Sequence, residues 1–312
     1  LDFEPGPYCV LIGENNSGKS NVLRALNLAL GETWPSERSF SEEDFHKFRE
    51  YFYRKTGIQF EVSKRYFVDK RLLDRMEATD NATFRAYFTM LRFQASGEEL
   101  QVLTNLMTVN ETYFFREEYQ FKCLVDSILP HLVERKRDQT TLRIWVIPSS
   151  SGEEPYSIAI YLLERWADIH NFDVEIIASD IDTTILAQAR RGLYSDRSIG
   201  QLPLPLLQKY FRRSRDGYQI SDDLRGAVEF TRVNLSEPAD TRPYRNFDVV
   251  FCRNLLIYFD DLSRKTAAET FYDALKPGGF ICLGHSESMS RISSLYKVVK
   301  FPQAIVYQKP TE

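Results

Sequence analysis

Residues 138–312 alternate short β-branched runs with amphipathic segments, a pattern typical of an α/β domain with a mostly parallel sheet. The sequence predicts strands at 142–147, 174–179, 228–233, 247–252 and 280–284. It predicts helices at 155–169, 183–190 and 262–275, and a closing hairpin at 296–300 and 304–309. The expected fold is therefore a doubly wound sheet with an antiparallel end.

The chain before residue 138 differs in its residue pattern and divides into two segments. Residues 47–137 mix charged and aromatic side chains with very little glycine, which predicts an all-α domain. Residues 1–46 predict a strand, a glycine-rich loop and a helix. In the last segment, residues 216–220 followed by 227–232 predict a small antiparallel β insertion. The expected organisation is 1–46, 47–137 and 138–312, with the insertion at about 212–232.

Composition and charge narrow the class of protein. The 312 residues are 43% hydrophobic and 27% charged, so we expect a packed soluble core. A net charge of −4 argues against a general nucleic-acid-binding protein. No apolar run reaches the roughly 18 residues of a membrane span, so we expect no membrane insertion. Four cysteines without a CxxC pair predict neither a disulfide framework nor a metal site, and favour a cytoplasmic protein.

Candidate chemistry lies where the predicted strands end, because ligands of open α/β sheets bind beyond the carboxyl ends of the strands. The first strand leads into Gly152, which permits close approach of the backbone to a ligand. The second ends at Asp180, an acid placed to accept hydrogen bonds from both hydroxyls of a ribose. The fourth leads into Asn254, which offers polar groups to a cofactor. Together these positions predict a nucleoside-binding site.

These strand ends belong to longer motifs that together resemble the CheR family of chemoreceptor methyltransferases. The resemblance runs from about residue 47 to residue 312. Its motifs are 108–116, 150–159, 178–183, 189–194, 233–235, 251–259 and 283–287, in the family's order. The family implies a class I, Rossmann-like methyltransferase fold that follows an all-α domain.

The resemblance also implies an activity, its cofactor and its partner. The enzyme would be a bacterial, cytoplasmic protein-glutamate O-methyltransferase that uses S-adenosylmethionine. It would esterify glutamate side chains on the cytoplasmic helices of chemoreceptors and release S-adenosylhomocysteine. We expect a monomer. In the family, an insertion such as the one at 212–232 can bind a receptor's tail peptide.

The resemblance assigns roles to residues at the motif positions. Asn110, Thr112 and Arg116 would meet the cofactor from the helical side, and Arg116 would also lie near the reacting carboxylate. Glu153 or Glu154 would lie near the methionine part, and Asp180 would hold the ribose. The remaining assignments are Asn234 and Leu235 at the adenine, Asn254 and Leu255 closing the site, and Tyr258 near the methyl group.

The chemistry expected at this site needs no general base. A glutamate carboxylate has a reference pKa near 4.3 and is already ionised at neutral pH. Arg116 is expected to hold that carboxylate, because a guanidinium matches it bidentately. Tyr258 would form an aromatic wall, with a buried core tyrosine as the alternative interpretation. Pro148 stands where the family usually has a small residue, and it removes a backbone donor from the loop.

The segment 47–76 carries nine basic and four acidic residues. On one helix, Lys64, Arg71 and Arg75 would fall within about 40° of one another and form a basic stripe. We interpret the stripe as a docking surface for acidic, glutamate-bearing receptor helices. The alternative is an ordinary solvated helix face.

The first segment contains a phosphate-binding motif. Residues 13–20 fit GxxxxGK[ST] between a predicted strand and a predicted helix. The sequence of this segment resembles the start of an SMC-like or OLD-family ATPase. Gly13, Gly18, Lys19 and Ser20 would contact nucleotide and Mg²⁺. Fewer than about 50 residues cannot build an NTPase domain, so we expect no ATP turnover. A P-loop ATPase and a non-catalytic CheR-like binding module remain the alternative functions.

Overall fold

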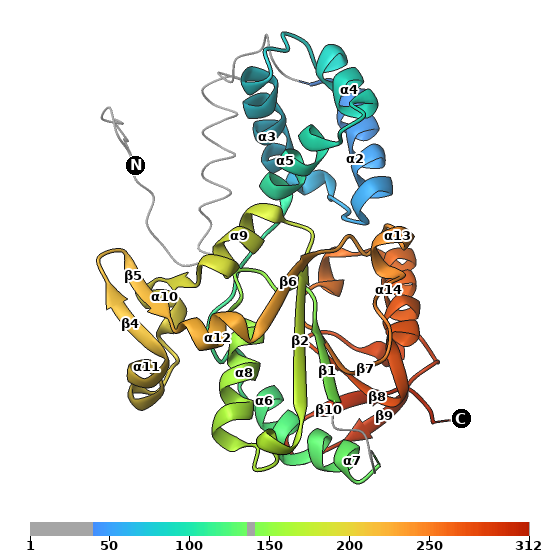
Figure 1. The fold of residues 1–312 in the computed structure, drawn as a ribbon. Helices are drawn as coiled ribbons and strands as arrows, with labels where there is room; N and C mark the ends of the chain where they lie inside the picture. The colour runs from blue at the N-terminus through green and yellow to red at the C-terminus, as the bar shows by residue number, and fades with distance from the viewer. Residues whose placement is uncertain (1–39, 136–140, 312) are drawn as a thin grey trace, which may run out of the picture.

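The computed structural model describes residues 40–135 and 141–311. They form a helical domain, residues 42–107, which stands over one end of a sheet domain, residues 110–311 (Figure 1). The predicted P-loop motif with Gly13, Gly18, Lys19 and Ser20 lies outside the described residues. No helix in the described ranges is both long and apolar enough to span a membrane.

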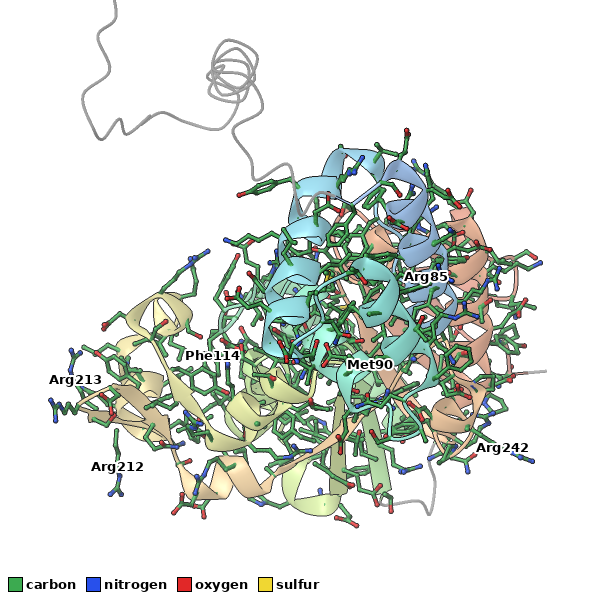
Figure 2. All side chains as sticks on the ribbon, turned by 90° about the horizontal axis from the view of Figure 1, so that it is seen from above. Arg85, Met90, Phe114, Arg212, Arg213 and Arg242 are labelled. Atoms are coloured by element: carbon green, nitrogen blue, oxygen red, sulfur yellow. The ribbon has the colours of Figure 1, made fainter. Side chains whose placement is uncertain are left out.

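The helical domain packs four helices around an aromatic core. They are α2 (Glu42–Thr56), α3 (Arg65–Ala78), α4 (Phe84–Phe93) and α5 (Glu98–Met107), with a short 3₁₀ turn η1 (Val62–Lys64) before α3. Helix α2 starts at a capping box formed by Ser41 and Asp44 and stops at Gly57, which has a φ of 72°. Phe48, Phe52 and Tyr87 are fully buried between the helices. Figure 2 looks down on this domain, with Arg85 and Met90 of α4 labelled.

The next three helical segments belong to the sheet domain. They are α6 (Tyr119–Cys123), η2 (Leu124–Ile128) and α7 (Leu129–Val133). Phe114, Phe121 and Leu129 are buried in one cluster with the central strands, whereas the core of the helical domain ends at Met107. The two cores therefore divide near residue 108, well before the predicted boundary at 137. The boundary at 137 was predicted from the helical pattern of the sequence, but the apolar contacts of a helix decide which domain it belongs to.

The main sheet has seven strands in the order β6-β2-β1-β7-β8-β10-β9. β1 (Thr141–Val146), β2 (Asp173–Asp180), β6 (Val228–Arg232), β7 (Phe247–Cys252) and β8 (Leu275–Leu283) run parallel. β10 (Ile305–Gln308) pairs antiparallel with β8 and with β9 (Lys297–Lys300). The predicted doubly wound sheet with an antiparallel end is confirmed.

Helices cover both faces of this sheet (Figure 1). The long ones are α8 (Glu153–Arg165), α9 (Thr183–Arg191) and α14 (Asp261–Ala274). Shorter segments connect the remaining strands: η3 (Ile169–Asn171), α12 (Asp222–Gly226), α13 (Pro238–Thr241), η4 (Leu256–Tyr258) and η5 (Met289–Arg291). All six residues of β7 are buried, as expected for a central parallel strand covered on both faces.

A second, three-stranded sheet projects from the side of the domain (Figure 1). It consists of β3 (Leu193–Tyr194), β5 (Gly217–Ile220) and β4 (Phe211–Ser214), with α10 (Asp196–Ile199) and α11 (Leu204–Tyr210) between them. Arg212 and Arg213 point outward at its tip (Figure 2). The antiparallel insertion is present, but it spans 193–220 instead of 212–232. Residues 228–232 pair parallel with β2, because Val228 and Phe230 are buried in the main core.

Candidate functional site

A cavity of about 780 Å³ lies between the helical domain and the carboxyl ends of β1, β2, β6 and β7. It is lined from the helical side by residues 107–112 and by the connection between α2 and α3. Of the residues predicted for the cofactor and the catalytic role, ten line it: Asn110, Thr112, Arg116, Glu154, Asp180, Asn234, Leu235, Asn254, Leu255 and Tyr258. Gly152 and Glu153 do not.

Asp180, at the end of β2, is buried and faces this cavity. Its Oδ2 accepts a hydrogen bond from the Ser150 amide at 2.8 Å, and its Oδ1 accepts one from the Asp182 amide at 3.0 Å. Burial raises the pKa of Asp180 to about 6, against the lowering effect of these amides. The carboxylate is therefore ionised at neutral pH, and each oxygen keeps acceptor capacity for a ligand hydroxyl.

Asp182 holds the segment that follows α5 against this edge of the sheet. Its Oδ1 caps α9 by accepting the amides of Thr184 and Ile185. Its Oδ2 accepts hydrogen bonds from the Thr108 hydroxyl at 2.7 Å and the Asn110 amide group at 3.0 Å. The hydrogen bond to Asp182 therefore fixes the Asn110 side chain at the cavity.

Gly152 stands behind the cavity wall, at the start of α8. Its φ is 96°, and an added Cβ would lie 3.0 Å from the Tyr156 ring and from the Tyr194 hydroxyl. Glycine is required here by the backbone conformation and by close packing of the helix. The turn shapes the loop that carries Ser150, and Gly152 itself is not part of the lining.

The neighbouring carboxylates Glu153 and Glu154 have different environments. Glu153 is buried behind the cavity, where its two oxygens accept hydrogen bonds from the hydroxyls of Ser198 and Ser151, each at 2.6 Å. Glu154 lines the cavity, and its Oε2 accepts a hydrogen bond from Arg253 Nη1 at 2.8 Å. Its Oε1 is buried without a hydrogen-bond partner among the described residues. Burial raises the pKa of Glu154 more than Arg253 lowers it.

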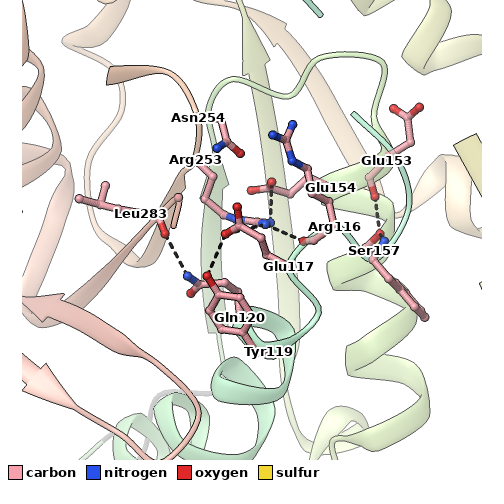
Figure 3. Close-up of polar contacts among 12 residues, drawn as sticks. Arg116, Glu117, Tyr119, Gln120, Glu153, Glu154, Ser157, Arg253, Asn254 and Leu283 are labelled. Atoms are coloured by element: carbon pink, nitrogen blue, oxygen red, sulfur yellow. Dashed lines mark hydrogen bonds and ion pairs between the residues drawn. The ribbon is translucent and has the colours of Figure 1, made fainter. Parts of the chain in front are cut away.

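Arg116 lines the cavity from the loop before α6, and its Nη1 donates to the Glu111 carbonyl at 2.6 Å. Figure 3 shows Arg116, Glu154 and Arg253 converging from three separate segments. The buried Arg253 donates to the Arg116 carbonyl at 2.6 Å and lies 3.3 Å from a carboxylate oxygen of Glu117. Arg253 belongs to the motif at 251–259, although the sequence predicted no role for its side chain.

Four further predicted residues follow β6 and β7 and also line the cavity. Asn234 uses its amide group internally, because Nδ2 donates to the Lys55 carbonyl at 2.6 Å and Oδ1 accepts the Ser236 amide. Leu235 and Leu255 add apolar surface beside it. The Asn254 amide donates to Glu287 at 2.9 Å, so Glu287 fixes this loop. Glu287 is the last residue of the motif at 283–287, although the sequence predicted no role for it.

Tyr258 lies on the rim of the cavity, where the residue is 41% exposed. This position differs from that of a buried core tyrosine, the alternative raised by the sequence. Pro148 also lines the cavity, between β1 and the Gly152 turn. Thr112 lies beside Glu111 on the helical side.

The three predicted docking cations have different environments. Lys64 is exposed at the cavity mouth. Arg71 covers the ring of Phe67, with its guanidinium carbon 3.3 Å from the ring centroid, and donates to the Leu106 carbonyl. Arg75 forms a bidentate pair with the buried Glu99, at 2.9 and 2.8 Å. Lys64 thus faces the mouth, while the guanidinium groups of Arg71 and Arg75 are engaged inside the helical domain.

Comparisons with known proteins match nearly the whole described chain. A family model described as "CheR methyltransferase, SAM binding domain" matches residues 110–305. A second, "CheR methyltransferase, all-alpha domain", matches residues 43–108. A third, "Protein of unknown function (DUF2813)", matches residues 3–61, so the predicted P-loop ancestry of that segment stays a prediction.

Relatives from several bacteria align over most of their length. "Chemotaxis protein methyltransferase 2" of Vibrio cholerae is 56% identical over 276 residues, covering 88% of this chain and 96% of the relative. "Chemotaxis protein methyltransferase 2" of Pseudomonas aeruginosa is 39% identical over 269 residues, covering 84% and 92%. "Chemotaxis protein methyltransferase" of Salmonella typhimurium is 33% identical over 287 residues, covering 88% and 91%.

Proposed function

This chain belongs to the CheR methyltransferase family, and on that premise we propose that it methylates glutamate side chains of bacterial chemoreceptors. The methyl donor is S-adenosylmethionine, and the products are a glutamyl methyl ester and S-adenosylhomocysteine. The observation that carries the proposal is the convergence of Asp180, Glu154 and Arg116 on one cavity. These groups suit the ribose, the ammonium group and the acceptor carboxylate, respectively.

The cavity lining fits S-adenosylmethionine chemically. Glu154 Oε1 is a buried acceptor without a partner among the described residues, which suits the cofactor's ammonium group. Asp180 offers acceptor positions to the two ribose hydroxyls. Asn234 and Leu235 would border the adenine, and Asn110 and Thr112 would cover the cofactor from the helical side. Bound there, the cofactor supplies a methyl group on a positively charged sulfur, which is a good leaving group.

The protein's part in the reaction is positioning. Arg116, at the same cavity, would hold the substrate carboxylate by its guanidinium and orient one oxygen toward the methyl group. Tyr258 on the rim would exclude water from one side. Because the carboxylate is already ionised, no residue has to remove a proton. Alignment of this kind can supply roughly 7–11 kcal/mol of the barrier in favourable cases.

We propose Lys64 as the docking cation nearest to the reacting groups, because it is exposed at the cavity mouth. Its partner would be the acidic, glutamate-bearing face of a receptor helix. This surface and the cavity belong to a protein that would act in the bacterial cytoplasm. Segment 1–46 has no assigned part in this activity.

The test is methyl transfer to isolated receptor-containing membranes from S-adenosylmethionine with a labelled methyl group. We expect label on the receptor that mild alkali releases as methanol, because a methyl ester is hydrolysed whereas a methylated amine is not. Calorimetric titrations with S-adenosylmethionine and with ATP accompany the assay. Cofactor binding without transfer would favour a non-catalytic module, and ATP hydrolysis would favour the P-loop alternative.

A further inference from the structure

Arg253 is a buried arginine that follows β7 and lies at the meeting point of three chain segments (Figure 3). Its Nη1 donates to Glu154 on α8, and its Nη2 donates to the carbonyl of Arg116. The Nη2 atom also lies 3.3 Å from Glu117. A single planar guanidinium therefore contacts two parts of the site. One is the Glu154 carboxylate, proposed to bind the cofactor, and the other is the backbone of Arg116, proposed to bind the substrate.

The substrate side of this arrangement needs an external anchor. Phe115 and Glu117, on either side of Arg116, have φ values of 61° and 54°. A left-handed conformation is unfavourable for residues other than glycine, especially bulky ones, and persists only where the surroundings hold it. Two of the contacts that hold this loop flank Arg116: Arg253 donates to the Arg116 carbonyl, and the Ser157 hydroxyl accepts a hydrogen bond from the Phe115 amide at 3.1 Å.

The cofactor side depends on the same guanidinium. Glu154 lines the cavity, and its Oε2 is oriented by Arg253 at 2.8 Å, while its Oε1 is a buried atom without a hydrogen-bond partner among the described residues. Without that contact, the carboxylate loses the group that fixes its rotation. Lysine cannot replace the guanidinium, because one ammonium group does not span these separate acceptors in a fixed plane.

We propose that Arg253 is a positioning residue that couples the cofactor side of the site, through Glu154, to the substrate side, through the backbone of Arg116. This inference rests on the proposed function. The alternative is a purely structural buried ion pair, which would add to the free energy of unfolding without affecting binding or turnover of the folded protein.

Arg253→Lys in the full chain tests the coupling, with kcat and KM for receptor membranes and the Kd for S-adenosylmethionine as readouts. We expect kcat per folded molecule to fall about 100-fold, since a displacement of about 1 Å has that effect on an aligned reaction. We expect the cofactor Kd to rise roughly tenfold, because Glu154 loses the guanidinium hydrogen bond that orients its carboxylate. Receptor KM should change little, because Lys64 lies at the mouth.

The matched control is Arg75→Lys, which alters another guanidinium paired with a buried carboxylate, Glu99, inside the helical domain. We expect a lowered melting temperature but unchanged kcat and cofactor Kd. If Arg253→Lys gives the same result as this control, Arg253 is only structural and the proposal is wrong.

Ser157→Ala provides a second test if Arg253→Lys does not fold. It releases the Phe115 amide and leaves Glu154 and Arg253 intact, so kcat should fall about fivefold with an unchanged cofactor Kd. An unchanged kcat would contradict the need for an anchored loop. If the wild-type protein transfers no methyl group to the receptor, the proposed function is wrong. The cofactor Kd of Arg253→Lys would then still test whether Arg253 positions Glu154.

Discussion

The helical domain and the carboxyl edge of the sheet both carry many charged residues, but they use them differently. In the helical domain, Arg75 and Glu99 pair with each other and Arg71 covers Phe67. At the sheet edge, Asp180 faces the cavity with spare acceptor capacity, and Glu154 has an oxygen without a partner among the described residues. The difference teaches that a charged group indicates a ligand site when it lines a cavity and keeps acceptor capacity there.

The strongest test of this difference is Arg116→Ala at the sheet edge. We expect kcat to fall at least about 1,000-fold, because a preorganised charge at the reacting group is lost. The melting temperature should be nearly unchanged, since the Arg116 side chain donates to the Glu111 carbonyl and lies over the Tyr113 ring, while the backbone contact to Arg253 is retained in the variant. Turnover assays and thermal melts check both parts. Near-normal turnover would remove Arg116 from the mechanism.

Arg75→Ala is the corresponding change in the helical domain. We expect the free energy of unfolding to fall by about 3 kcal/mol, because Glu99 is left buried without its charged partner. Cofactor affinity should stay the same. Chemical denaturation and calorimetry measure the two quantities, and a loss of activity without a loss of stability would assign Arg75 to docking after all.

Asp180→Asn tests the open carboxylate. We expect the Kd for S-adenosylmethionine to rise roughly 50-fold at pH 7.5, because two hydrogen bonds to a charged acceptor are weakened. In the wild-type protein the Kd should rise by about tenfold per pH unit below the pKa of about 6, as protonation removes the acceptor. Titrations from pH 5 to pH 8 should show this dependence, and the variant should lack the part that belongs to Asp180.

Asp180 also contributes to the pH dependence of the free energy of unfolding. The sign of this contribution is opposite to that of a carboxylate whose pKa is lowered by folding. The pKa of Asp180 is raised in the folded protein, so the protonated form is favoured by folding. This contribution to the free energy of unfolding is fully present below the unfolded pKa of about 3.9 and is lost as the pH rises through about 6. An apo protein whose Asp180-dependent stability increased over that interval would contradict the raised pKa.

Lys64→Glu should give the smallest effect. Lys64 is exposed, so we expect the receptor KM to rise about fivefold at low salt and the salt dependence of KM to become flatter. The kcat at saturating receptor should not change. Assays at several salt concentrations measure this, with Lys70→Glu as the matched control, because Lys70 is an exposed residue on the following helix α3 and lies outside the cavity lining. Equal effects of the two substitutions would indicate general charge attraction without a specific dock.

Sequence patterns predicted the sheet well because each strand carries its own signal. The predicted segment 247–252 coincides with β7, and 183–190 lies inside α9. The insertion was misplaced because Val228 and Phe230 look the same in a hairpin and in an edge strand of the main sheet. Only burial against that core distinguishes the two. The helices after residue 108 were assigned to the wrong domain for the same reason.

The sequence by itself determined the family, the parallel sheet, and Asp180 at a strand end. These features depend on local periodicity and on which residue follows a strand. Only the tertiary structure decided that Glu154, and not Glu153, reaches the cavity, that Gly152 supports the wall from behind, and that Arg253 joins Glu154 to Arg116. Those facts depend on contacts between segments far apart in the chain, which no local pattern records.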